Sequence, residues 1–203
     1  MNPMLAKQLD EVAWVSFTGR IGVGALMAVV VPGSFALRAT SFANDLVWDT
    51  PRGDLVVRNQ KGLAALRVPA AQVQTFTKNP AFSLSVQTAL ADDLQKLTDV
   101  EGRAEVITLA GSAESEEQAR FVANAVHLLV QHHETRAPLA KVSARGTGVG
   151  RERGGAAVVP GPVDYVSWTE KVAGFAVRED LTAPTRSLWI TGRMSPRARK
   201  EFE

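Results

Sequence analysis

The chain has 203 residues, of which 45% are hydrophobic and 22% charged, the composition of a folded globular protein and not of a disordered chain. It has no cysteine, which excludes disulfides, thiolate catalysis, zinc–thiolate sites and iron–sulfur clusters. Residues 1–140 carry 12 Lys or Arg and 14 Asp or Glu, a balance of −2, whereas residues 141–203 carry 11 and 7, a balance of +4. The C-terminal third therefore favours anionic partners, although its charge is too low to predict a nucleic-acid partner.

The first 60 residues are predicted to be β-rich. Short apolar runs at 12–17, 25–31 and 35–40 are candidate strands, and residues 46–58 form a candidate hairpin with Pro51 and Gly53 at favoured turn positions. The uncharged run 21–36 is shorter than the ~20 residues that a bilayer requires, so it predicts no transmembrane span. We interpret it as a buried strand, with a membrane or export element as the alternative.

Residues 61–140 predict a helix–strand–helix unit. Pro69 and the pair Asn79-Pro80 are typical of helix starts, and a helical apolar face follows the second of them. Residues 105–110 alternate like a strand that ends at Gly111, and a second helix opens at 112–118. Apolar residues of this unit are expected to share one core, namely Leu90, Leu94, Ile107, Phe121, Val122 and Val126.

The remaining chain predicts a Gly/Pro-rich linker or hairpin at 141–162 and a second helix–strand–helix unit at 163–203, truncated at its end. In the hairpin interpretation, strands at 141–144 and 156–159 pair across a flexible glycine stretch, 146–155. The second unit has a helix at 163–177, a strand at 187–191 and a helix at 195–202. An offset of 81 residues places Gly111 on Gly192 and Ile107 on Leu188, which suggests a structural duplication.

The stretch 105–126, EVITLAGSAESEEQARFVANAV, carries a resemblance to a known family. Apolar residues fill a strand (Val106, Ile107 and Leu109), Gly111 makes the turn, and a helical apolar face follows. This stretch resembles the strand–glycine–helix core of the BON domain family. The resemblance implies an envelope-associated, non-enzymatic module that contacts a membrane or a protein.

A basic segment near the C-terminus is the best candidate site. Ser195 and Pro196 predict a helix start directly after a strand, and free N–H groups at a helix start favour anions. Basic side chains cluster around this start, so the predicted anion-binding residues are Arg193, Ser195, Arg197, Arg199 and Lys200. The alternative is a solvent-exposed basic helix without a ligand.

Other candidate motifs predict no chemistry. The glycines at 146–150 lack the spacing of a phosphate-binding loop, and no G-x-S-x-G motif is present. His127, His132 and His133 are interpreted as polar residues near a helix end, with a metal site at 132–134 as the alternative. The acidic pairs at 92–93 and 116–117 are interpreted as solvated helix faces.

The sequence thus predicts an α+β fold, with a β-rich N-terminal portion and two helix–strand–helix units around a mixed sheet. We expect a non-enzymatic binding or structural protein that contacts an anionic lipid or a protein partner and uses neither a cofactor nor a metal. An alanine- and arginine-rich composition suggests a bacterial protein, and the cell envelope or periplasm is favoured over the cytoplasm. The alternative function is an enzyme whose site is assembled from scattered residues.

Overall fold

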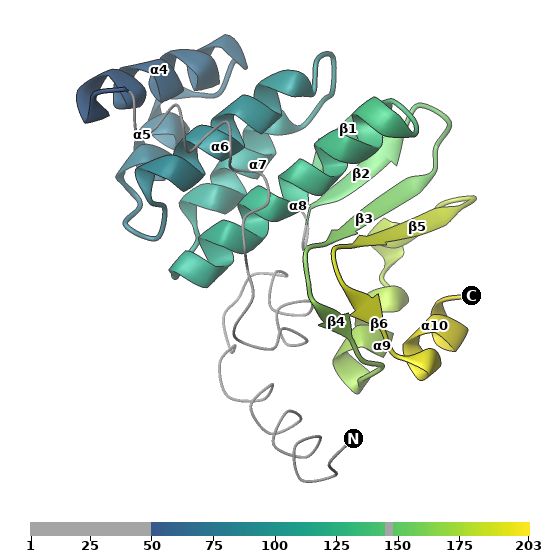
Figure 1. The fold of residues 1–203 in the computed structure, drawn as a ribbon. Coiled ribbons are helices and arrows are strands. Elements are labelled where there is room, and N and C mark those ends of the chain that lie inside the picture. Colours follow the sequence, from purple (N-terminus) through teal and green to yellow (C-terminus); the bar gives the residue numbers. More distant parts are fainter. Residues whose placement is uncertain (1–49, 145–147) are drawn as a thin grey trace, which may run out of the picture.

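Helices fill the first half of the part that the structure describes. The structure is a computed structural model that describes residues 50–144 and 148–203. It has an α+β architecture in which a helical layer covers one face of a mixed sheet (Figure 1). The helices of this layer are α4 (Arg52–Ala65), α5 (Ala70–Lys78), α6 (Leu84–Lys96), α7 (Arg103–Gly111) and α8 (Glu116–Thr135).

Two predicted strands are helices. Residues 54–58, the second half of the predicted hairpin, belong to α4, which buries Leu55, Asn59 and Leu63 at a spacing of four. Residues 105–110 belong to α7, where the buried positions 106, 107 and 110 form one helical face. Both runs contain two adjacent β-branched residues, Val56-Val57 and Val106-Ile107, which favour strands, but their buried positions follow the helical period. The rest of the predicted β-rich portion lies outside the described residues.

Local capping explains where the long helices begin. Ser83 and Ser115 accept hydrogen bonds from the backbone N–H groups three residues later, so they cap α6 and α8. Pro69 directly precedes α5, as predicted. The pair Asn79-Pro80 does not open a helix, because the Asn79 Oδ1 accepts a bond from the N–H of Ala81 and forms a turn.

The sheet has four strands in the order β1 (Leu139–Ser143), β2 (Val149–Glu152), β3 (Ala157–Gly161) and β5 (Arg186–Ile190). Both predicted strands around the glycine stretch are present, but they do not pair with each other. Strand β2, which falls within the stretch predicted to be flexible, lies between β1 and β3 and is antiparallel to both. Gly150 is buried in β2, where a Cβ atom would lie 2.9 Å from Leu129 Cδ2 of α8. The glycine therefore allows the sheet to approach the helix.

The last unit differs from its prediction at its start. Strand β5 and helix α10 (Pro196–Phe202) agree with it. The predicted helix at 163–177 is instead a short strand, β4 (Tyr165–Val166), followed by α9 (Glu170–Ala176). Strand β4 pairs in parallel with β6 (Arg193–Met194), and a 3-10 helix, η2 (Glu179–Leu181), precedes β5.

The proposed duplication is wrong. Gly111 ends helix α7, whereas Gly192 lies between strands β5 and β6, so the two glycines are not equivalent. A glycine is required at position 192 for another reason, because a Cβ atom there would lie 1.9 Å from the backbone oxygen of Asp164. The glycine permits the close approach that pairs β6 with β4.

A single hydrophobic core joins the helices to the sheet. It extends from Leu63 in α4 to Ala198 in α10 through α8 and strand β3. The predicted shared core is confirmed, because it includes Leu90, Leu94, Ile107, Phe121, Val122 and Val126. Helix α8 packs along one face of the sheet. Helices α9 and α10 lie close to strands β4 and β6, at the end of the molecule that holds the C-terminus (Figure 1).

Candidate functional site

The backbone of the basic segment is tied to the protein itself. The Ser195 Oγ accepts a hydrogen bond from the N–H of Ala198 at 3.1 Å, so the predicted helix cap is confirmed. The N–H groups of Arg193 and Ser195 donate to the carbonyl oxygens of Asp164 and Val166, each at 2.8 Å. Because these donors are used, the segment offers a ligand its side chains and not an open backbone cradle.

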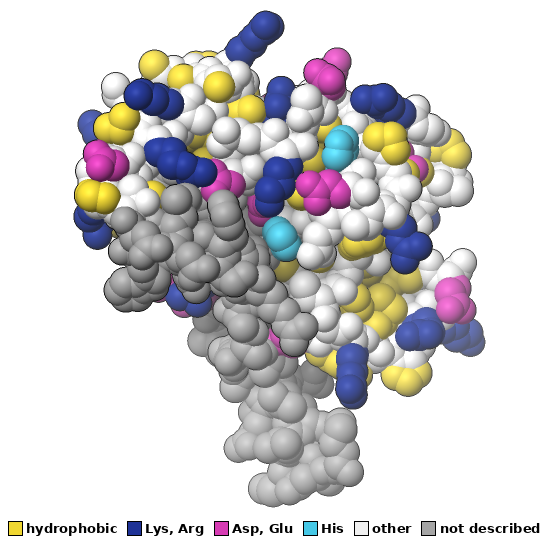
Figure 2. Space-filling view, turned by 45° about the horizontal axis from the view of Figure 1, so that its top comes forward, with side chains coloured by type: hydrophobic (Ala, Val, Ile, Leu, Met, Phe, Trp, Pro, Cys, Tyr) yellow, Lys and Arg dark blue, Asp and Glu magenta, His cyan; other side chains and the backbone are white. Residues whose placement is uncertain are grey.

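The side chains of this region form a basic surface. Residues 181–200 contain five Lys or Arg and no Asp or Glu. All five basic residues are exposed, and none forms an ion pair with another described residue: Arg186, Arg193, Arg197, Arg199 and Lys200. Figure 2 shows Lys and Arg side chains beside exposed apolar ones, with an acidic side chain among them, at the end of the molecule that holds α10. Four of these five are the predicted basic residues, and Arg186 is added by the fold.

Strand β5 lies at an edge of the sheet. Within the described residues it pairs only with β3, to which it runs parallel (Figure 1). The N–H of Ala157 donates to Thr185 O, and the N–H of Thr191 donates to Gly161 O. Successive residues of a strand direct their backbone groups to alternate sides, so residues 187 and 189 face β3. The N–H and C=O groups of Arg186, Leu188 and Ile190 therefore point to the free edge.

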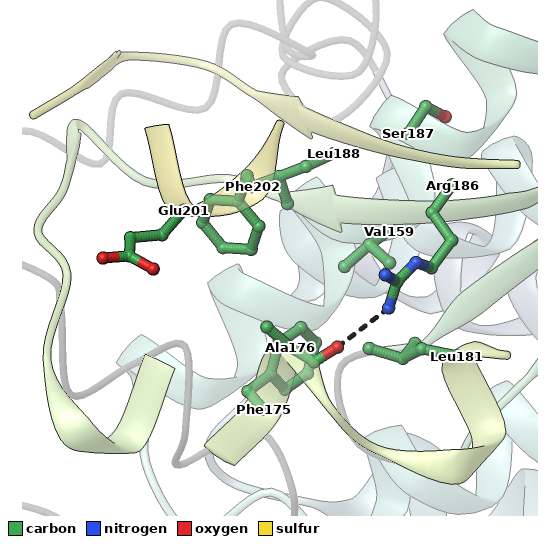
Figure 3. Close-up of a pocket in the computed structure, with 9 residues that line it drawn as sticks. All are labelled: Val159, Phe175, Ala176, Leu181, Arg186, Ser187, Leu188, Glu201 and Phe202. Atoms are coloured by element: carbon green, nitrogen blue, oxygen red, sulfur yellow. Dashed lines mark hydrogen bonds between the residues drawn. The ribbon is translucent and has the colours of Figure 1, made fainter. Parts of the chain in front are cut away.

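A cavity of about 140 Å³ lies beside this edge, between the sheet and the three short helices of the C-terminal end. Apolar side chains from several elements point into it, with the Arg186 side chain at one end and Glu201 at the other (Figure 3). The Arg186 guanidinium donates to the backbone oxygen of Ala176 at 2.9 Å, which holds it at the rim. The apolar lining consists of Val159, Phe175, Ala176, Leu181, Leu188 and Phe202.

A second cluster of charged groups lies between α4, α6 and α8. Asp93 is only 4% exposed, so its interpretation as a solvated residue is wrong. Its carboxylate bonds to the His127 Nδ1 at 2.9 Å and to the Lys96 Nζ at 2.8 Å. The hydrogen bond from Lys96 to Asp93 raises the pKa of Lys96, and the desolvation of the ammonium group partly opposes this effect. A carboxylate that orients an imidazole is an arrangement that general bases use, but the cavity described above is lined by other residues.

The other two histidines form hydrogen bonds between α8 and the sheet. The Nε2 of His132 lies 2.9 Å from Glu152 Oε1 on β2, and the Nδ1 of His133 accepts a bond from the N–H of Leu139 on β1. Within residues 50–144 and 148–203, no group of three or more His, Asp or Glu side chains is close enough to hold a metal ion. The same part of the chain contains no helix with the length and apolarity to cross a membrane.

Comparison with protein-family models, with curated proteins and with solved structures finds no match to the chain. The strand on which the BON resemblance depends is helix α7 in the structure.

The sequence did not show which residues would join the basic segment. Arg186, Leu188 and Phe175 lie beside it because β5 is an edge strand and α9 folds back under the sheet. The sequence offered one weak signal: the stretch Arg186-Ser-Leu-Trp-Ile190 lacks the proline or central lysine that protects many edge strands.

Proposed function

We propose that this chain is a non-enzymatic binding protein that contacts an anionic partner through its C-terminal basic surface, defined as Arg186, Arg193, Arg197, Arg199 and Lys200. The observation that carries the proposal is that these exposed cations have no acidic partner among the described residues. Basic side chains without an internal partner raise the local concentration of anions and orient an approaching acidic surface.

The position of this surface supports binding and not solvation alone. Arg193 lies two residues before the helix cap Ser195, and the N–H groups of these two residues bond to the β4 segment and fix the backbone between them. A fixed backbone reduces the conformational entropy that binding would cost. The apolar cavity next to Arg186 adds a contact that a purely solvated basic surface would not need.

The test compares the wild-type chain with the double variant Arg193→Gln/Arg197→Gln. One set of measurements uses vesicles with and without phosphatidylserine, and the other uses peptides rich in Asp and Glu against peptides rich in Lys. We expect the variant to bind the anionic probe about ten-fold or more weakly, since each cation near an anionic surface contributes about 1 kcal/mol. Wild-type binding should also weaken as the salt concentration rises.

A matched control is Arg67→Gln/Arg103→Gln, which removes the same charge from the helical layer. Binding of the anionic probe should be unchanged in this control. Equal binding by the wild-type chain and the Arg193/Arg197 variant, at every salt concentration, would contradict the proposed function.

A further inference from the structure

The free edge of β5 has the features of an acceptor for one more strand. Three residues of this strand direct both backbone groups outward: Arg186, Leu188 and Ile190. Proteins usually protect such edges with proline, a central lysine or a covering segment, because an unprotected edge pairs readily with another chain. No described strand pairs with this edge.

The basic charge around the edge favours an added strand with acidic residues. Arg186 begins β5 and Arg193 follows its end, so basic side chains flank the outward-facing backbone groups at both ends. No acidic residue lies between positions 181 and 200. An added strand with Asp or Glu at its two ends would place carboxylates beside these arginines.

The cavity supplies a place for an apolar side chain of the added strand. Arg186, Ser187 and Leu188 all line the cavity, but the Ser187 side chain points away from the Leu188 side chain, so alternate side chains of β5 are directed to it (Figure 3). Alternate side chains of a neighbouring strand project to the same face. A volume of about 140 Å³ suits one such group, since an apolar cavity of about 150 Å³ accepts benzene.

We propose that the partner is a protein that adds an extended, acid-flanked segment as a strand along the free edge of β5, with one apolar side chain in the cavity. This inference rests on the proposed function and names its partner class. A lipid headgroup could meet the arginines but could not pair with a strand edge. A nucleic acid would use neither the edge nor the cavity. Strand addition uses all three features at once.

The experiment selects binders from a phage-displayed library of ten-residue peptides. Each peptide has two Asp or Glu residues fixed at each end and six varied positions in the centre. Binders to the wild-type chain are then synthesised with one backbone N-methyl group at each position in turn. An added strand directs every second N–H towards β5, so affinity should fall about ten-fold at alternate positions and little between them. The selected peptides should also alternate apolar residues in the centre.

A variant of the chain supplies the complementary measurement. Leu188→Pro removes an N–H that points outward, so the bonds to β3 remain. Leu188→Ala removes the same side chain and keeps the N–H. We expect the proline variant to bind the peptide about ten-fold more weakly than the alanine variant, with both chains folded by circular dichroism.

The outcomes separate the two proposals. Peptide binding that depends on Arg193 and Arg197 but responds equally to every N-methyl group would keep the proposed function and overturn strand addition. Failure to recover any binder, or binding to vesicles alone, would also overturn it. A dimer of the chain that Leu188→Pro dissociates and that no acidic peptide displaces would show that a second copy occupies the edge, and it would overturn the inference as well.

Discussion

At the scale of single residues, helix starts in this chain combine capping with charge. Ser115 caps α8, and Gln118 reaches back so that its Oε1 accepts a bond from the N–H of Glu114 at 2.8 Å. Glu117 lies in the first turn, where its own backbone N–H, the Ser115 hydroxyl and the charge of Arg120 lower the pKa of its carboxyl group. The charged form of Glu117 therefore stabilises the folded state.

Replacing this carboxylate should have a pH-dependent effect. Because the pKa of Glu117 is lowered on folding, its contribution to stability is present above the unfolded value of about 4.5 and is lost as the pH falls through the folded value. We expect Glu117→Gln to lower the free energy of unfolding by about 0.5 kcal/mol at pH 7 and to have a smaller effect at pH 3, below the unfolded value. Urea unfolding of both chains at the two pH values measures this.

The control is Glu134→Gln in the last turn of the same helix. A negative charge is unfavourable at that end, so the control should not destabilise the chain at pH 7. A loss for Glu117→Gln that is as large at pH 3 as at pH 7 would contradict the electrostatic explanation.

At the scale of elements, Asn79 connects two helices that are distant in sequence. Its Nδ2 donates to the carbonyl oxygens of Gly111 at 3.0 Å and Ala113 at 2.9 Å. These carbonyl groups lie at or just beyond the end of α7, while Asn79 itself ends α5. The side chain of the residue that follows α5 therefore satisfies carbonyl groups at the end of α7, the helix that packs against α5.

Removing this amide should destabilise the helical layer. We expect Asn79→Ala to lower the free energy of unfolding by about 1–3 kcal/mol, because partly buried carbonyl groups lose their donor. Chemical denaturation followed by circular dichroism measures the change. Gln74→Ala, at an exposed position of α5, should change it by less than about 0.5 kcal/mol. Equal effects of the two substitutions would contradict the role of the amide.

The same elements show how far the sequence could predict the fold. The helical faces of α6 and α8 were predicted because their apolar residues repeat at helical spacing over long stretches. Helix α7 was predicted as a strand because nine residues with adjacent valine and isoleucine fit either period. Strand β2 was not predicted because Gly150 is typical of a flexible loop. The reason for a glycine at this position is the close contact with Leu129 of α8, which the local sequence does not show. Short elements depend on neighbours that the local pattern does not contain.

The candidate site was predictable only in part for a related reason. Ser195 as a cap and the basic residues after it follow from local rules, and the structure bears out the cap. The free edge of β5 depends on the strand order, which places the last long strand outside β3. The cavity depends on Phe175 and Phe202, which come from two helices on either side of β5 in sequence. The cavity has no local signal, and the only local signal of the edge is the absence of proline and of a central lysine from residues 186–190.

At the scale of the whole molecule, helix α8 contacts the edge strand β5 on the face of the sheet opposite the cavity. The His132 ring, only 4% exposed, meets the Trp189 ring of β5 edge to face, with centroids 4.8 Å apart. The Nε2 of the same histidine bonds to Glu152 on β2. Trp189 faces away from Leu188, which lines the cavity on the opposite face of the sheet. Contacts with α8 on this face of the sheet thus hold β5, the strand at the edge, in position.

This arrangement predicts energetic coupling between α8 and β5. We expect His132→Ala and Trp189→Ala each to destabilise the chain, and the double variant to lose less than the sum of the two. The coupling free energy should be about 0.5–1.5 kcal/mol, the range for an edge-to-face ring pair. Urea unfolding of the four chains measures it. Because Trp168 meets Phe202 of α10 and not His132, the effects of His132→Ala and Trp168→Ala should instead add. Additive effects in the His132–Trp189 pair would mean that the ring contact does not anchor β5, and the edge would then depend on its hydrogen bonds to β3 alone.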